Sequence, residues 1–587
     1  MDSSYWRQMR ITMENRKNIV LCSDGTGNTM MKGRGTNVWK LYEAVDLTAH
    51  RWHQGNGDEN GRGKEQIAFY DDGVGSQENK LMKITGGAFG WGLKRNVLDL
   101  YKSLCRAYRA GDDIYIFGFS RGAYTARVLG GLILSCGILR HDSWKTDEKL
   151  DELSKEAYGN FRSHFRLGTA KGRKAYKTRR QAADAARELE GADKESKNEM
   201  ARKVQELEQA ASQAEQEAES ARNKAVAKTD KFRRKNAIQD EIHAPDGEVT
   251  IRFIGVWDTV AAVGLPFREI TKAWNRWVYP FMFPDYLLSS RVLKGCHAIS
   301  IDDERRTFHP MMWDEREPDV KNPGHVEQVW FAGVHSNVGG GYPKQGISLV
   351  ALDWMMQRAE KMGLKFIESE RERYRHLQNV HDKLYDSRHG LAVYYRYRPR
   401  HIEDICGRLG VSPAIHVSAL ERIALGTQNY APGNLPGDFK IVTTDSNSGA
   451  SLEDPQKLSA VVAAIEGESA SDQVRFWISL RRVIYTVFVM VTVSIVGLAG
   501  WYHSKTNKPE PWVPQGLDDT LEKGFGFLPW GETLYELLIR PLFLYPVYAA
   551  IAVGLLLVFW AVSRYARVRL RRTFAQFWRS KLPAPWW

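Results

Sequence analysis

The stretch IYIFGFSRGAYTAR at residues 114–127 places the strongest constraint on how this chain folds. Apolar and aromatic residues run into GFSRG, and apolar residues at helical spacing follow. A serine nucleophile held on a tight strand-to-helix turn needs small residues on both sides, because the two backbones come close together there. The bare GxSxG pattern also arises by chance, and Ser120 could then be a structural serine. Ser120 is therefore a candidate nucleophile, and the rest of the sequence has to supply the fold and the partner residues that this role requires.

Apolar runs and amphipathic stretches alternate along much of the chain. NIVLC (18–22) and IYIFGF (114–119) predict buried strands, and LKRNVLDLYKSLCRAYRAG (93–111) predicts an amphipathic helix that ends at a glycine. After a long interruption the pattern resumes with VTIRFIGVW (249–257) and EQVWFAGV (327–334). Apolar strands separated by helices are typical of a mostly parallel sheet covered on both faces. The predicted fold class is α/β, with a sheet like that of the α/β-hydrolases.

Two further residues lie where a serine nucleophile needs its partners. A histidine must remove the serine proton, and a carboxylate must orient that histidine. In this architecture the order along the chain is serine, acid, histidine, with both partners on loops just after strands. Asp258 follows the apolar run that ends at Trp257, and His335 follows the run that ends at Val334. We predict Ser120, Asp258 and His335 as the catalytic residues.

Other residues compete for the two partner roles. His416 lies later in the chain, where the histidine of such hydrolases often falls, and His309 is a second rival. His297 follows an apolar run, which favours a structural role. Among the acids, Asp24 precedes the serine, which is the wrong order, and Asp302 lies in the charge cluster DDERR.

Ester hydrolysis by a serine also needs backbone N–H donors for the oxyanion of the tetrahedral intermediate. The residue after the nucleophile, Arg121, is expected to supply one donor. The glycine-rich stretch NIVLCSDGTGNT offers Gly25 and Thr26 as further candidates, although it also fits an ordinary Asp-Gly turn. No GxxxxGK[ST] or HExxH motif occurs in the chain, which argues against a P-loop or a zinc protease.

Residues 160–245 differ in composition, being rich in Ala, Glu, Lys, Arg and Gln. RRQAADAARELE (179–190) is expected to fold back as an antiparallel helix against the stretch that follows it. A heptad seam, with steps of four and three, runs through Met200, Val204, Leu207, Ala211, Ala214, Ala218, Ala221 and Ala225. We predict a charged coiled-coil insertion, which is either a docking arm for a partner or membrane surface or a solvated spacer.

Two segments near the C-terminus are long and apolar enough to span a bilayer. Residues 483–501 and 542–562 contain no charge, and spans of 19 and 21 residues match a hydrocarbon core of about 30 Å. The alternative is a pair of buried helices. Arginines flank the outer ends of both segments, so the charge bias places both chain ends in the cytoplasm. Much of the net charge of +13 is thereby explained without nucleic acid.

These patterns predict a chain of several parts. The N-terminus has no apolar stretch of signal-peptide length, so Sec-type export is not expected. The predicted parts are an N-terminal extension at 1–16, a catalytic domain at 17–159 and 246–442, the insertion at 160–245, a polar linker at 443–474 and a membrane region at 475–587.

Six stretches together resemble one family, the type VI secretion phospholipase effectors with an α/β-hydrolase catalytic domain. They are NIVLCSDGTGNT, TNVWKLYEA, YDDGVGS, GFSRGAYTARVLGGLI, FIGVWDTVAAVG and VWFAGVHSNVGGGYP, in the family's order over residues 17–435 apart from the insertion. The resemblance implies a triad of Ser120, Asp258 and His335, hydrolysis of a glycerophospholipid acyl ester, and no metal or organic cofactor. Asn337 stands where the family usually has aspartate, which changes the polarity of that loop.

The prediction that follows is a membrane-associated serine phospholipase in the bacterial inner membrane, delivered by a type VI system as an antibacterial effector. Expected partners are a phospholipid membrane, a component of the secretion apparatus, a chaperone that shields the apolar hairpin, and a cognate immunity protein. Two alternatives stay open. One is a toxin or scaffold that acts mainly by inserting its C-terminal hairpin, and the other is an esterase or thioesterase acting on small soluble acyl compounds.

Overall fold

The structure is a computed structural model of the 587-residue chain. It describes residues 16–25, 35–48, 64–72, 87–190, 197–240, 247–260, 287–315, 324–389, 392, 395–444, 472–505 and 546–581. The predicted N-terminal extension at 1–16, apart from its last residue, and most of the predicted linker at 443–474 lie outside these ranges.

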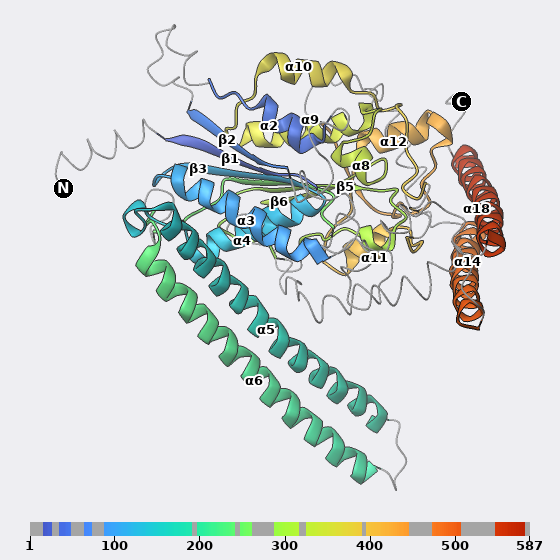
Figure 1. The fold of residues 1–587 in the computed structure, drawn as a ribbon, viewed down its shortest axis with the longest axis horizontal. Helices are drawn as coiled ribbons and strands as arrows, with labels where there is room; N and C mark the ends of the chain where they lie inside the picture. Colours follow the sequence, from blue (N-terminus) through green and yellow to red (C-terminus); the bar gives the residue numbers. More distant parts are fainter. Residues whose placement is uncertain are drawn as a thin grey trace.

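One parallel sheet forms the centre of the molecule (Figure 1). Its strands lie in the order β2-β1-β3-β4-β5-β6-β7-β8, and every neighbouring pair runs parallel. The strands are β1 (Lys17–Ser23), β2 (Glu65–Asp71), β3 (Asp113–Phe119), β4 (Phe253–Trp257), β5 (Gly295–Ser300), β6 (Val326–Phe331), β7 (Ala414–His416) and β8 (Lys440–Val442). This architecture agrees with the predicted α/β class.

Helices cover both faces of the sheet (Figure 1). The helices around the sheet are α2 (Asn37–Ala44), α3 (Gly87–Ala107), α4 (Arg121–Cys136), α8 (His335–Gly339), α9 (Gly346–Lys361), α10 (Glu368–Leu377), α11 (Ile402–Gly407) and α12 (Val417–Ala424). Successive residues of a strand point to opposite faces. In β1, Ile19 and Leu21 join the core that includes α3 and α4, whereas Val20 and Cys22 join the core that includes α2 and α9. Burial on both faces explains why the strands are continuous apolar runs in the sequence.

The strand order creates a crevice at the carboxyl edge of the sheet. From β1 the chain crosses to β2 on one side, and it then returns to β3 on the other side of β1. At such a switch point the loops after the two adjacent strands diverge, and ligands of open α/β sheets bind there. The loops after β1 and β3 begin at Asp24 and Ser120, so the candidate nucleophile lies at this edge.

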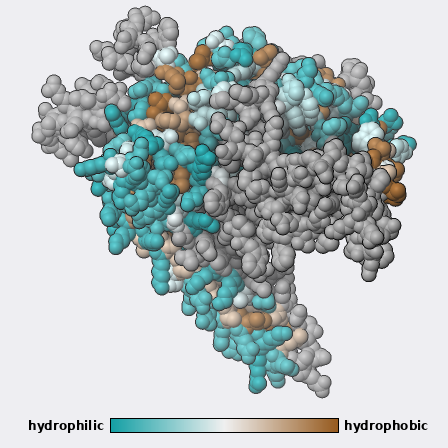
Figure 2. Space-filling view, in the orientation of Figure 1, coloured by the Kyte–Doolittle hydropathy of each residue, from teal (hydrophilic) through white to brown (hydrophobic). Residues whose placement is uncertain are grey.

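Two long helices, α5 (Asp147–Glu190) and α6 (Lys197–Asn236), lie side by side and extend from the sheet as an arm (Figure 1). The first helix begins before residue 160, where the sequence predicts that the insertion starts. Every position of the predicted heptad seam is buried or half-buried. Ala175 and Ala182 of α5 and Ala211 and Ala214 of α6 are buried, because alanine allows the two helices to approach closely. The exposed side chains described on the arm are mostly charged or polar, and hydrophilic residues predominate on the visible part of its surface (Figure 2). Supercoiling of this pair stays a prediction.

The predicted transmembrane hairpin is wrong. Within the ranges that the structure describes, no helix is long and apolar enough to cross a membrane. Residues 483–501 lie in α14 (Asp472–Lys505), and residues 546–562 of the second predicted span lie in α18 (Pro546–Lys581), while 542–545 fall outside the described ranges. The two helices pack on each other, with the rings of Phe488 and Phe559 stacked at 3.8 Å. A count of uncharged residues cannot distinguish a spanning helix from a helix that packs against protein.

Polar and apolar contacts join α14 and α18 to the catalytic domain. The Arg481 guanidinium donates to both carboxylate oxygens of Glu304 at 2.8 and 2.9 Å, and also to the Tyr397 hydroxyl at 3.0 Å. Burial raises the pKa of a carboxyl, but this ion pair outweighs it and lowers the pKa of Glu304 to about 2. The Phe574 ring lies directly on Gly433, where a Cβ atom would overlap the ring.

Replacing Arg481 tests this attachment. Arg481→Met leaves the Glu304 carboxylate without its partner, and breaking a buried ion pair in this way costs about 3 kcal/mol. We expect faster hydrogen exchange of the α14 amides and a lower free energy of unfolding in urea. Arg482→Met is the matched control on the next, exposed residue, and it should change the free energy by less than about 0.5 kcal/mol. Equal effects of the two variants would contradict a specific role for Arg481.

Candidate active site

Ser120 occupies a strained turn between β3 and α4. Its backbone angles are φ 59° and ψ −119°, in a region that residues other than glycine rarely adopt. Its N–H donates to the carbonyl of Trp257 at 3.0 Å, which fixes the turn against β4. The glycines on both sides are required by close approach. A Cβ atom on Gly118 would lie 2.4 Å from the Gly122 carbonyl oxygen, and one on Gly122 would lie 2.1 Å from the Ser23 carbonyl oxygen.

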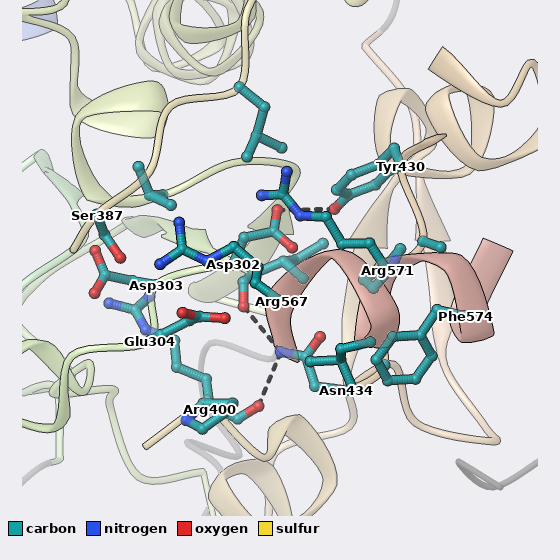
Figure 3. Close-up of a pocket in the computed structure, with 18 of the residues that line it drawn as sticks. Asp302, Asp303, Glu304, Ser387, Arg400, Tyr430, Asn434, Arg567, Arg571 and Phe574 are labelled. Atoms are coloured by element: carbon teal, nitrogen blue, oxygen red, sulfur yellow. Dashed lines mark hydrogen bonds between the residues drawn. The ribbon is translucent and has the colours of Figure 1, made fainter. Parts of the chain in front are cut away.

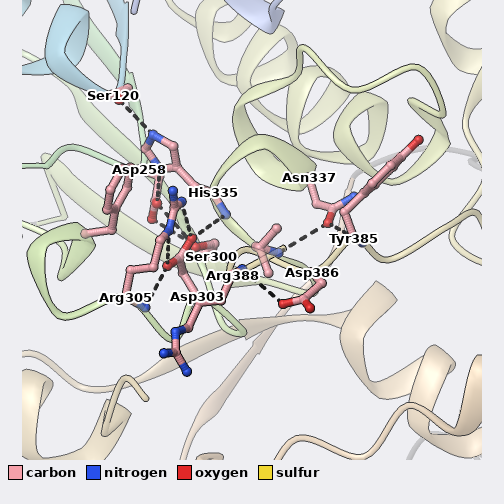
Figure 4. Close-up of polar contacts among 12 residues, drawn as sticks. Ser120, Asp258, Ser300, Asp303, Arg305, His335, Asn337, Tyr385, Asp386 and Arg388 are labelled. Carbon is pink, nitrogen blue, oxygen red and sulfur yellow. Dashed lines mark hydrogen bonds and ion pairs between the residues drawn. The ribbon is translucent and has the colours of Figure 1, made fainter. Parts of the chain in front are cut away.

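The three predicted catalytic side chains form one hydrogen-bonded chain (Figure 4). The Oγ of Ser120 lies 2.7 Å from Nε2 of His335, and Nδ1 of His335 lies 2.5 Å from Oδ2 of Asp258. An ionised carboxylate only accepts hydrogen bonds, so Nδ1 carries the ring proton and donates to Asp258. The lone pair of Nε2 therefore faces the Ser120 hydroxyl, which is the arrangement that lets the histidine accept its proton.

Asp258 is fully buried and is held ionised by residues that sequence reasoning missed. Arg400 donates to both of its oxygens, at 2.6 and 2.8 Å, and the Ser300 N–H donates to Oδ1 at 3.0 Å. Burial raises the pKa of a carboxyl, but the Arg400 ion pair and the hydrogen bond from His335 outweigh it and hold the pKa of Asp258 well below its usual range. No sequence motif marks Arg400, which lies 142 residues after Asp258.

The His335 ring is enclosed by aromatic side chains. Phe119 lies 4.7 Å from it between ring centroids, and Phe308 meets it edge-on at 5.0 Å. Burial lowers the pKa of His335 below its usual 6.5, although the Asp258 carboxylate opposes this effect. The backbone N–H of His335 donates to Asp303 at 3.2 Å, which fixes the start of α8. Burial thus favours the neutral imidazole, and its contacts hold it in one orientation.

Comparison with known proteins identifies the family of the chain. The family model described as the catalytic domain of Tle1-like phospholipase effectors of the type VI secretion system matches residues 17–358, more than half of the chain. The chain belongs to this family. The matched range contains Ser120, Asp258 and His335, whereas Arg400 lies beyond it. A protein of Saccharomyces cerevisiae, named only as uncharacterized protein YEL023C, is 31% identical to this effector-family chain over 163 residues. That match covers 23% of the chain and 22% of the yeast protein.

The predicted oxyanion donors of this Tle1-like domain have different surroundings in the structure. Arg121 begins α4, and the first N–H groups of a helix have no acceptor within that helix. The Gly25 N–H donates to Oδ1 of Asp24 at 2.6 Å, so this donor is engaged by a side chain. Thr26 lies outside the described residues. Asp24 also accepts from Thr36 and Tyr70, and burial raises its pKa to about 6.

The rival residues lie in other surroundings. His416 stacks on Phe331 and is hydrogen-bonded to Ser418 and Thr444, and burial lowers its pKa to about 3. His297 accepts the Thr259 N–H, and burial likewise lowers its pKa to about 3. The remaining rivals also have other partners, since His309 contacts the Arg398 carbonyl and Asp302 accepts from Gly333 and Tyr430.

Two further features of the site concern Asn337 and metal binding. The Asn337 side chain accepts from the Tyr385 N–H and donates to the Lys383 carbonyl, so it ties the loop after α10 to α8 (Figure 4). Across the described ranges, no group of three or more His, Cys, Asp and Glu residues is arranged to hold a metal ion.

Substitution at Gly122 tests the turn. In Gly122→Ala the new methyl group meets the backbone of Ser23 and Asp24, which cannot move aside as a side chain can. We expect a loss of about 1–3 kcal/mol or more in the free energy of unfolding, measured in urea. The control is Gly159→Ala in α5, where a Cβ atom meets nothing within 4 Å. It should be neutral or stabilising by up to about 1 kcal/mol. A Gly122→Ala protein as stable as the control would refute the close approach.

Proposed function

We propose that the chain is a serine phospholipase that hydrolyses acyl esters of glycerophospholipids through Ser120, His335 and Asp258. The observation that carries the proposal is the continuous hydrogen-bonded chain from the Ser120 hydroxyl through His335 to Asp258, at 2.7 and 2.5 Å. Membership of a phospholipase effector family supports the substrate class. The same family supports delivery into a target cell by a type VI secretion system.

The proposed mechanism gives each of the three side chains the role that its geometry supports. Oγ of Ser120 attacks the acyl carbonyl carbon while Nε2 of His335 takes its proton, and Asp258 stabilises the imidazolium that forms. The oxyanion is stabilised by backbone N–H groups, with the Arg121 N–H as the first donor. The intermediate collapses as His335 protonates the oxygen of the departing lysophospholipid. A water molecule deprotonated by His335 then attacks the acyl-serine, which releases the fatty acid and restores Ser120.

Exposed apolar side chains on α14 and α18 support contact with a phospholipid surface. Brown atoms lie at the edge of the molecule where Figure 1 places these helices (Figure 2). Exposed members of the set are Val483, Val487, Met490, Ile551, Leu557, Val558 and Trp560. Exposed apolar side chains that gather in one region often mark an interaction surface. We therefore propose that this region lies against lipid during catalysis and that a chaperone covers it before delivery. Membership of the effector family supports a cognate immunity protein that protects the producing cell.

The decisive experiment replaces the nucleophile. Ser120→Ala removes the attacking oxygen, and we expect release of fatty acid and lysolipid to fall by at least about 10³-fold. The measurement is mass spectrometry of the products from a defined two-chain phospholipid in vesicles, which also reports which ester bond is cleaved. Circular dichroism and the melting temperature of the variant control for folding. Undiminished lipid hydrolysis by a folded Ser120→Ala protein would exclude this mechanism, and hydrolysis of soluble esters alone would indicate an esterase.

The Arg400–Asp258 ion pair predicts a pH effect. Removing a nearby cation favours proton uptake, so Arg400→Gln should raise the pKa of the Asp258–His335 pair. The acid limb of kcat/KM, which falls when this pair takes up a proton, should move to higher pH by about one unit. The wild-type limb should lie below pH 6.5, because the pKa of His335 is lowered. Activity on a soluble short-chain ester is measured against pH, with Arg400→Lys as the variant that keeps the charge. A limb that does not move in Arg400→Gln would restrict Arg400 to a structural role.

A further inference from the structure

A cavity of about 420 Å³ lies between the catalytic domain and the helices α14 and α18 (Figure 3). This volume is in the range of sites for small ligands. The wall contains Asp303 and Arg400, which hold His335 and Asp258, but neither Ser120 nor His335 lines the cavity. The cavity is therefore separate from the nucleophile and borders the residues that position the rest of the triad.

Arg422, in α12, lines this cavity and has an unused binding edge. Its side chain is fully buried, its Nη1 donates to the carbonyl groups of Val380 and Asp382, and its guanidinium lies 5.3 Å from the Tyr430 ring. Among the described residues, neither its Nε nor its Nη2 has a hydrogen-bond partner. These two N–H groups form the flat edge with which arginine binds carboxylate or phosphate bidentately. Leaving buried charged donors unsatisfied is costly, so this edge indicates a ligand.

The charges around the cavity leave an excess of cations. Most of its acids have their own arginine, since Glu304 pairs with Arg481, Asp386 with Arg567 and Asp303 with Arg305.

Asp302 is the remaining acid, and it faces two arginines. Its Oδ2 already accepts from the Gly333 N–H and the Tyr430 hydroxyl. Arg422 and Arg571 both lie close enough to influence its titration, and burial raises its pKa to about 6. Figure 3 shows Arg571 reaching into the cavity from the helix that also carries Phe574. Guanidinium groups from two elements, α12 and α18, thus line the cavity together with this carboxyl.

We propose that this cavity binds a phosphate group, with Nε and Nη2 of Arg422 donating to two of its oxygens and Arg571 to a third. A phosphate offers three acceptor oxygens to two converging guanidinium groups, whereas a carboxylate has only two oxygens. Ile478 and Leu570 supply apolar wall beside the arginines, so the phosphate can belong to a phospholipid head group or be free in solution. The inference does not depend on the proposed hydrolytic function.

A bound phosphate would bridge two parts of the molecule. Arg422 belongs to the catalytic domain and Arg571 to α18, so the ligand adds a link between them. A ligand that binds only the folded, docked state raises the stability of that state. Phosphate is therefore expected to raise the melting temperature and to slow hydrogen exchange of the α18 amides.

Binding is measured on the full chain carrying Ser120→Ala, so that no lipid is consumed. The two probes are sodium phosphate and dihexanoyl phosphatidylglycerol below its micelle concentration, both at ionic strength fixed with sodium chloride. Isothermal titration calorimetry should show binding that Arg422→Gln and Arg571→Gln each weaken by at least about tenfold. Arg571→Gln changes an exposed residue and so keeps the test valid if Arg422→Gln does not fold. Arg569→Gln, an exposed arginine of α18 that does not line the cavity, should bind as the parent does.

The outcomes distinguish a lipid head group from free phosphate as the source of the bound phosphate, and they also show whether the proposal fails. Tighter binding of the lipid than of inorganic phosphate identifies a head-group site, and equal binding identifies a site for phosphate itself. The proposal is overturned if neither probe binds, or if both arginine variants bind as tightly as Arg569→Gln.

Discussion

The buried carboxylate of Asp258 is the group on which the site depends. Burial alone would neutralise it, and a neutral acid could not fix the tautomer of His335 or stabilise the imidazolium. Arg400 donates to both of its oxygens, and the Ser300 N–H donates to one of them. Asp258 follows β4, Ser300 ends β5, His335 begins α8, and Arg400 precedes α11. One charge therefore ties together four segments that are far apart in the sequence, and it does so at the carboxyl edge of the sheet.

Four central strands, β1, β3, β4 and β6, could be predicted from the sequence as apolar runs, whereas β5 was missed although it is equally buried. In β3 and β4 every residue is buried, so these strands are continuous apolar runs. The outer strands gave no such signal, since β2 is half-exposed over most of its length, and β7 and β8 have three residues each. The C-terminal helices were misassigned for a related reason. Apolar length indicates a nonpolar environment but does not say whether lipid or protein provides it, and the contact of Phe488 with Phe559 comes from tertiary packing alone.

Some residues of the candidate site could be predicted from local sequence, and others depend on contacts that only the tertiary fold creates. Ser120 and Asp258 each follow a strand directly, and His335 lies four residues after the end of β6, so their positions could be inferred from the strands and the chain order. Arg400 could not, because it follows no regular strand and meets Asp258 only through the tertiary fold. Gly25 is a residue that local sequence indicated but whose expected role the structure does not support. Its place in a glycine-rich loop indicated an N–H donor, but the neighbouring Asp24 carboxylate accepts that N–H, and no sequence pattern reports how a side chain turns back on its own loop.

Three consecutive acids after β5 connect the site with the C-terminal helices. Asp302 accepts from Gly333 and Tyr430, Asp303 accepts the backbone N–H of His335, and Glu304 accepts from Arg481 of α14. Adjacent residues of an irregular segment point in different directions, so one short stretch reaches the cavity, the histidine and the docked helix together. Their carboxylates are held by buried partners, which makes the stretch costly to displace. A change in the docking of α14 would therefore act first on Glu304. It would then act on the neighbouring Asp303, which fixes the start of α8.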